Sequence, residues 1–149
     1  VFVALAQDKV KINLGGLKYP LLARDTEIQG DVHFVITDPH SKNGWELIEG
    51  HPLLVQAAEE HMKTWWYKDL KTRTQVFYAF RIIPNSARDK EGWCLSRSGF
   101  SDKAEVSARY SAGSETKKGR VTIYDPAVYI SVRIIGSCAD TMQAVASTQ

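Results

Sequence analysis

The chain has 149 residues, a formal net charge of +2 and 44% hydrophobic residues. This length is enough for one domain with its own hydrophobic core. The small net charge and the lack of a long basic run argue against a nucleic-acid-binding surface, and no apolar run reaches the roughly 20 residues that a membrane-spanning helix needs.

Residues 1–16 form an N-terminal segment with the alternation of a β-strand. Its apolar arm is formed by Val1, Phe2, Val3 and Leu5. Ala4 and Ala6 stand where the end of a signal peptide has small residues, so the segment is either a signal-peptide remnant or a mature strand. A mature strand of this kind pairs in its own sheet or with the next molecule. Both interpretations favour an exported protein, periplasmic or extracellular.

Residues 17–84 have the pattern of a small α+β unit. A short helix is expected at residues 19–24, with Pro20 near its start. Alternating apolar residues predict three strands, at residues 31–37, 45–49 and 74–83.

The stretch at residues 50–67 predicts one amphipathic helix around which this unit is organised. Pro52 suits the first helical position, because the missing N–H of proline has no intrahelical partner there. The apolar stripe repeats at a spacing of four and consists of Leu54, Ala58, Met62 and Trp65. His61 lies beside this stripe and is interpreted as a boundary residue.

Residues 85–138 are predicted to form a β-rich extension, and residues 139–149 a polar tail. Alternation predicts strands at residues 103–111, 121–124 and 128–134, and residues 113–119 are expected to be a polar connection. The fold class is therefore α+β: a small antiparallel sheet with two helices on one face, extended by a β-rich C-terminal half.

Several short motifs of residues 19–83 occur together. They are Tyr19-Pro20 with Ala23, Gly30-Asp31-Val32, Gly50-His51-Pro52-Leu53-Leu54, Ala57-Ala58 before Trp65-Trp66-Tyr67, and the aromatic strand at residues 76–80. In this combination they resemble the TonB C-terminal domain family. The resemblance covers under half of the chain and implies a three-stranded antiparallel sheet with two helices.

The resemblance also implies a periplasmic binding domain without catalysis. Family members bind an extended peptide of outer-membrane transporters, the TonB box, beside a sheet edge, and several of them exchange strands to form dimers. Unpaired main-chain groups of an edge strand accept another strand, and alternate side chains give selectivity. The predicted edge is the strand at residues 74–83, with Thr74, Val76, Phe77, Tyr78 and Phe80 as the partner-binding residues.

Residues with catalytic or metal-binding chemistry form no recognisable pattern. The four histidines, His33, His40, His51 and His61, have no metal-ligand spacing, and no nucleophile elbow or phosphate-binding glycine pattern is present. We therefore expect no catalytic residue, metal or cofactor. The rival hypothesis is a carbohydrate-binding or hydrolytic protein that uses the C-terminal half around Trp93 and Arg97.

The two cysteines, Cys94 and Cys138, are far apart and belong to no metal-binding pattern. A disulfide between them is predicted for an exported protein, with two buried free thiols as the alternative.

The favoured hypothesis is a non-catalytic protein-interaction domain that works by strand addition at a sheet edge. Self-assembly into an oligomer or extracellular filament through the N-terminal arm is the first version, because a head-to-tail contact repeats without closing. Binding of a TonB-box-type peptide of an outer-membrane transporter is the alternative.

Overall fold

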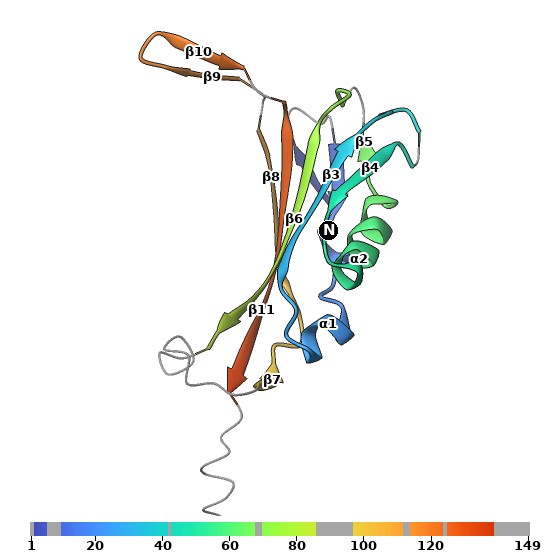
Figure 1. The fold of residues 1–149 in the computed structure, drawn as a ribbon, viewed down its shortest axis with the longest axis vertical. Coiled ribbons are helices and arrows are strands. Elements are labelled where there is room, and N and C mark those ends of the chain that lie inside the picture. Colours follow the sequence, from blue (N-terminus) through green and yellow to red (C-terminus); the bar gives the residue numbers. More distant parts are fainter. Residues whose placement is uncertain are drawn as a thin grey trace, which may run out of the picture.

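A computed structural model describes residues 2–5, 10–41, 43–67, 70–85, 97–111, 114–123 and 125–138. It is a mixed α+β structure with a large sheet and two helices, so the coarse fold class is confirmed (Figure 1). The strands of the main sheet are β3 (Gly30–Ile36), β4 (Trp45–Glu49), β6 (Gln75–Pro84), β7 (Arg97–Phe100), β8 (Glu105–Ser111) and β11 (Ala127–Cys138).

The order of the main sheet is β4-β3-β6-β11, and both β8 and β7 pair with the far side of β11. Strand β6 is antiparallel to β3 and parallel to β11, in a register that runs from Gln75–Ala127 to Pro84–Gly136. The C-terminal half thus extends the same sheet as the first half. The prediction that residues 74–83 form the sheet edge is wrong, because β6 has a hydrogen-bonded neighbour on each side.

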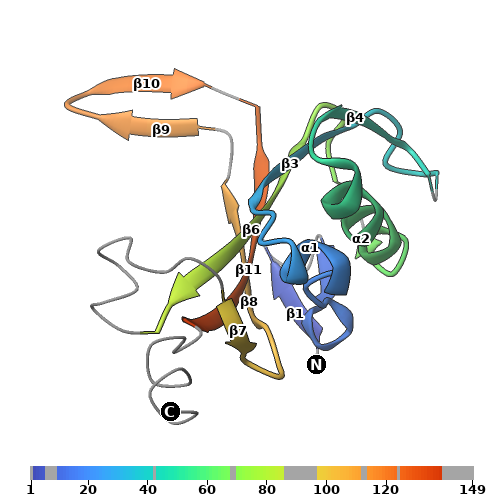
Figure 2. The same ribbon diagram turned by 60° about the horizontal axis from the view of Figure 1, so that its bottom comes forward.

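One face of the sheet is covered by α1 (Leu21–Asp25), α2 (Pro52–Met62) and the 3₁₀ turn η1 (Leu14–Gly16), as Figures 1 and 2 show. Alternate residues of the central strands point to this side. The fully buried large side chains there include Val32, Phe34, Val76, Tyr78, Phe80, Val128 and Ile130. Burial of this apolar surface is the main stabilising term of the fold.

Helix α2 begins as predicted but ends earlier. The His51 imidazole accepts the N–H of Leu53, and Pro52 occupies the first helical position. After Met62 the chain tightens into a turn: the Thr64 hydroxyl donates to the His61 carbonyl at 2.6 Å. The predicted helix over residues 50–67 is therefore too long, and residues 66–67 form the short strand β5 (Trp66–Tyr67).

The N-terminal segment pairs within its own chain. Strand β1 (Phe2–Leu5) is antiparallel to β2 (Val10–Asn13), and β2 pairs in turn with β5. Ile12 of β2 belongs to the buried core. Of the two possibilities weighed for this segment, the structure therefore has the folded-back strand, and addition of the segment to another molecule as an assembly arm stays a prediction.

Strands β8 and β11 continue into a hairpin of β9 (Ser114–Lys117) and β10 (Arg120–Ile123) that projects from the body (Figures 1 and 2). The turn at Lys118-Gly119 has φ values of 53° and 76°, as a type I′ turn requires. Within the range 113–119, predicted as a polar connection, Ser114–Lys117 thus form a strand. Within the part of the chain that is described, neither helix has the length and apolar character to span a membrane.

Candidate functional site

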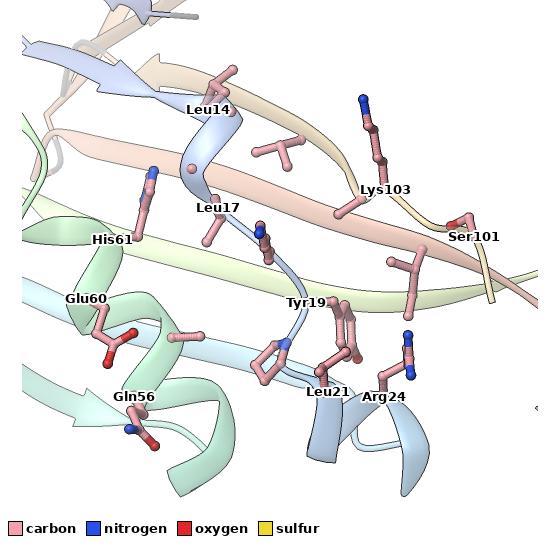
Figure 3. Close-up of a pocket in the computed structure, with 18 of the residues that line it drawn as sticks. Leu14, Leu17, Tyr19, Leu21, Arg24, Gln56, Glu60, His61, Ser101 and Lys103 are labelled. Atoms are coloured by element: carbon pink, nitrogen blue, oxygen red, sulfur yellow. The ribbon is translucent and has the colours of Figure 1, made fainter.

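A groove of about 1060 Å³ lies on the helix side of the main sheet. Its walls come from η1 and α1, from α2, and from the segment that joins β7 to β8. Figure 3 shows Gln56, Glu60 and His61 of α2 on one side of the groove, and Ser101 and Lys103 on the other. This volume lies at the upper end of the range of ligand-binding clefts.

The lining combines an apolar interior with a few charged groups. Apolar lining residues include Leu14, Leu17, Tyr19, Leu53, Val106 and Ile134. The Tyr19 hydroxyl donates to the Ile28 carbonyl at 2.5 Å, and burial raises the pKa of Tyr19 to about 12, opposed by the nearby Arg81 charge. Tyr19 is therefore a neutral hydrogen-bonded wall of the groove at physiological pH. The charged lining residues are Lys18, Arg24, Glu60, Asp102 and Lys103.

His61 lies at the inner end of the groove and is buried, with 4% of its surface exposed. Its Nε2 lies 2.9 Å from the carbonyl oxygen of Asn13, which only accepts, so Nε2 carries the proton and donates. Nδ1 then accepts from the Tyr78 hydroxyl at 2.7 Å and from the Trp65 indole N–H at 3.3 Å. Burial lowers the pKa of His61, opposed by its bond to Asn13. The interpretation of His61 as a boundary residue is wrong, since it joins α2, β2 and β6 inside the core.

Strand β8 forms the outer edge of the sheet beside this groove, and Val106 both belongs to β8 and lines the groove. The Gln75 amide donates to the Pro126 carbonyl, and the Asn85 amide donates to the Gly136 carbonyl. The main-chain groups of the even-numbered residues of β11 therefore point toward β6. Odd-numbered residues of β11 therefore face β8, where residues 105, 107, 109 and 111 are their partners. The main-chain groups that point outward from β8 belong to Val106, Ala108 and Tyr110.

The outer side of β8 has no hydrogen-bonded strand among the described residues, although β1 and η1 contact β8. The pairing of β8 with β11 runs without a register shift from Glu105 to Ser111. At the opposite edge, β4 is shorter and carries a register shift at His33/Phe34, together with Glu46 and Glu49. Strand β4 thus presents a shorter and more acidic edge than β8.

The open face of the sheet carries a row of stacked side chains across four strands. The His33 and Phe77 rings stack at 4.3 Å, and the Phe77 and Tyr129 rings at 5.2 Å, with interplanar angles of 15° and 10°. The Arg109 guanidinium lies 4.2 Å from the centroid of the Tyr129 ring. These residues face one another directly in the strand registers, so the row follows from pairing and not from sequence proximity.

The residues predicted to bind a partner lie in different places. Thr74, Val76, Tyr78 and Phe80 are buried, and Phe77 belongs to the stacked row on the open face. Of the predicted arm, Phe2, Val3 and Leu5 lie in β1, and Val1 is outside the described residues. The residues that sequence reasoning missed are the outward-facing positions of β8, which had been predicted as a strand without being recognised as the edge.

The remaining predicted sites involve residues beyond the described ranges. Cys94 and Trp93 are outside them, so the disulfide with Cys138 stays a prediction; Cys138 pairs with Arg97 across the β11–β7 ladder. Arg97 itself binds Glu27 in an ion pair of 2.7 Å. Within the described residues, no group of three potential ligands is placed to hold a metal ion.

No family model, no curated protein and no solved structure matches this chain.

Proposed function

We propose that this chain is a non-catalytic, exported protein-interaction domain that binds an extended segment of a partner by strand addition to β8. The observation that carries the proposal is the outer edge of β8, where Val106, Ala108 and Tyr110 direct their main-chain groups away from β11. An edge of this kind pairs readily with another chain.

The groove beside β8 supports the proposal, because strand addition needs a source of selectivity. Successive side chains of an added strand point to opposite faces of the sheet. Those on the helix side meet the groove near Ala104 and Val106, where its interior is apolar and its rim carries Lys18 and Lys103. A segment with alternating apolar residues therefore fits this edge best.

The resemblance to the TonB C-terminal domain family gives the class of segment to try first, a TonB-box-type peptide of an outer-membrane transporter. A segment of another copy of this chain is the second class. The acceptor strand differs from the one that the resemblance implied, because β11 and β8 lie outside β6 and carry the sheet edge outward.

Hydrogen exchange followed by NMR tests the proposal, with a synthetic TonB-box peptide and a synthetic peptide of residues 2–8 as probes. Binding at this edge slows exchange at Val106, Ala108 and Tyr110, whose amides point outward, and leaves Ser107 and Arg109 unchanged because β11 already binds their amides. Unchanged exchange at all three outward amides with both peptides at millimolar concentration would contradict the proposal.

A pair of variants at Ala108 separates loss of the edge from loss of the fold. Ala108→Pro removes one outward N–H without removing a bond to β11, and proline is tolerated at such edge positions. Ala108→Ser keeps the N–H. The proposal expects peptide binding to weaken by about fivefold in the proline variant, since a hydrogen bond contributes on the order of 1 kcal/mol, and to persist in the serine variant.

A further inference from the structure

Two edge strands of this molecule carry exposed apolar side chains of complementary character. On β10, Val121 and Ile123 are 63% and 81% exposed. On β4, Leu47 and Ile48 are 41% and 51% exposed. Large aliphatic side chains exposed on a strand edge favour pairing with another strand. We propose that β10 of one copy pairs with β4 of the next copy, so that the protein assembles head to tail.

On both β10 and β4, main-chain N–H and C=O groups point away from the strand's own neighbour, where a new strand could bind them. In the β9–β10 hairpin, Lys117 and Arg120 flank the two-residue turn and form the first hydrogen-bonded pair. Hydrogen-bonded pairs alternate with non-hydrogen-bonded pairs along an antiparallel ladder, so the main-chain groups of Val121 and Ile123 point away from β9. On β3, the Ile36 amide donates to the Thr74 carbonyl, and the Ile36 carbonyl accepts the Arg73 amide. The main-chain groups of the even-numbered residues of β3 therefore point toward β6. Trp45 and Leu47, which face Ile36 and Phe34 of β3, therefore direct their groups away from the sheet.

One antiparallel register brings these groups together, with Val121 opposite Leu47 and Ile123 opposite Trp45. Because side chains alternate along a strand, all four of these side chains then lie on one face of the joined sheet. On the β4 strand this is the helix-covered face, where Trp45 packs against the core. The hairpin would thus continue an apolar layer that the molecule already has.

Charge favours this pairing over a pairing of β10 with β8. Residues 114–123 contain three cations, Lys117, Lys118 and Arg120, and one acid. Strand β4 contributes Glu46 and Glu49 and no cation. In the proposed register Arg120 lies diagonal to Glu46 on the other face, within reach of long side chains. Strand β8 carries one acid, Glu105, and one cation, Arg109, so it has no net charge to attract the basic hairpin.

The position of the two strands requires the contact to form between copies. Strand β4 is the outermost strand at one edge of the main sheet, whereas the hairpin projects beyond β8 and β11 at the other edge (Figure 1). A contact between two different surfaces is heterologous, so repetition gives an open filament unless the rotation between copies closes a ring. The inference rests on the proposed mechanism of strand addition but uses other strands, so either proposal can fail alone.

Charge reversal followed by sedimentation velocity tests this interface. Arg120→Glu and Glu46→Arg are each expected to weaken self-association by about tenfold, and the double variant is expected to recover most of the loss. Ile123→Lys is expected to abolish association. All three positions are exposed, so the variants are expected to fold, which far-UV circular dichroism checks. Lys63→Glu, at an exposed position outside the groove and outside both strands, is the control for net charge and is expected to leave association unchanged.

Three outcomes overturn the inference. A wild-type protein that stays monomeric at millimolar concentration excludes the interface, and the peptide experiments at β8 are unaffected. Single charge reversals that both weaken association without recovery in the double variant show that the two residues do not meet. Association that survives Ile123→Lys but is lost in Ala108→Pro shows that copies join through β8, which supports the proposed function and contradicts the β10–β4 contact.

Discussion

The Nδ1 atom of His61 lies 2.7 Å from the hydroxyl of Tyr78, deep between α2 and β6. With Nε2–H donated to Asn13, Nδ1 of the neutral imidazole accepts the proton of the Tyr78 hydroxyl. Protonation would place a second N–H opposite the Trp65 indole N–H, which cannot accept. Protonation of His61 therefore keeps the bond to Asn13 but sets an Nδ1–H against the Trp65 indole N–H.

The first prediction concerns acid stability. Burial lowers the pKa of His61 in the folded state below the ordinary 6.5, so the unfolded chain binds its proton first as the pH falls. The stabilisation is fully present above pH 6.5 and decreases as the pH falls toward the folded-state pKa. Urea unfolding between pH 8 and 5 measures this decrease. It should shrink in His61→Gln and persist in His40→Gln, where the histidine is exposed.

The second prediction concerns the polar contacts of His61 at neutral pH. His61→Ala leaves the Trp65 indole N–H, the Tyr78 hydroxyl and the Asn13 carbonyl without this partner. We expect a loss of about 2–4 kcal/mol in the free energy of unfolding, because each unsatisfied buried group costs about 1–3 kcal/mol. A loss smaller than that of the control substitution Leu53→Ala, at a half-buried position of the same helix, would contradict this account.

The third prediction concerns the turn before β4. A Cβ atom added to Gly44 would lie 1.8 Å from the carbonyl oxygen of Asp38, and backbone cannot move aside as a side chain can. The Gly44 carbonyl also accepts the amides of Thr37 and Asp38 at 2.8 and 3.0 Å. We expect Gly44→Ala to destabilise by more than about 2 kcal/mol. The matched control is Gly99→Ala, whose nearest neighbour, the Ser137 Cβ, would lie at an ordinary 3.7 Å.

The fourth prediction concerns the stacked row on the open face. A double-mutant cycle with Tyr129→Ala and Arg109→Ala should give a coupling of about 0.5–1 kcal/mol, the usual size of a cation–π contact at an exposed site. The same cycle between Tyr129 and Lys103, which lies outside the row, should give no coupling. Equal couplings in the two cycles would mean that the 4.2 Å contact contributes nothing specific.

Alternation and capping predicted several elements from the sequence, because these signals are local. Strands β3 and β11 alternate apolar and polar residues, and α2 begins where Pro52 predicts. The strand that pairs with a given strand is not encoded locally, and the neighbours of β6 were therefore predicted wrongly. The neighbour of β6 lies about fifty residues further along the chain, so nothing within residues 74–83 excluded an edge position except the apolar residues on both faces, such as Phe77 and Ile83.

The candidate site was harder to predict than the elements that form it. Val106 and Tyr19 were recognised as members of a strand and a helix start, but the groove exists only because η1, α2 and β8 converge. The hairpin was missed for another reason. Its turn uses Lys118-Gly119 instead of the Asn-Gly or Asp-Gly pairs that signal a type I′ turn in sequence.

The last prediction concerns Arg97 and Gly136, which are in contact where β7 meets β11. Arg97 binds Glu27 at 2.7 Å, and a Cβ atom on Gly136 would lie 2.5 Å from the Arg97 Cδ. Either Arg97→Ala or Gly136→Ala should therefore destabilise, the first by removing the ion pair and the packed side-chain stem, the second by displacing that stem. The double variant should lose less stability than the two single losses combined, since alanine at position 97 leaves room for the new methyl group. Strict additivity in urea unfolding would show that Ile82, whose Cγ2 would lie 3.0 Å from the added Cβ, is the group that resists it.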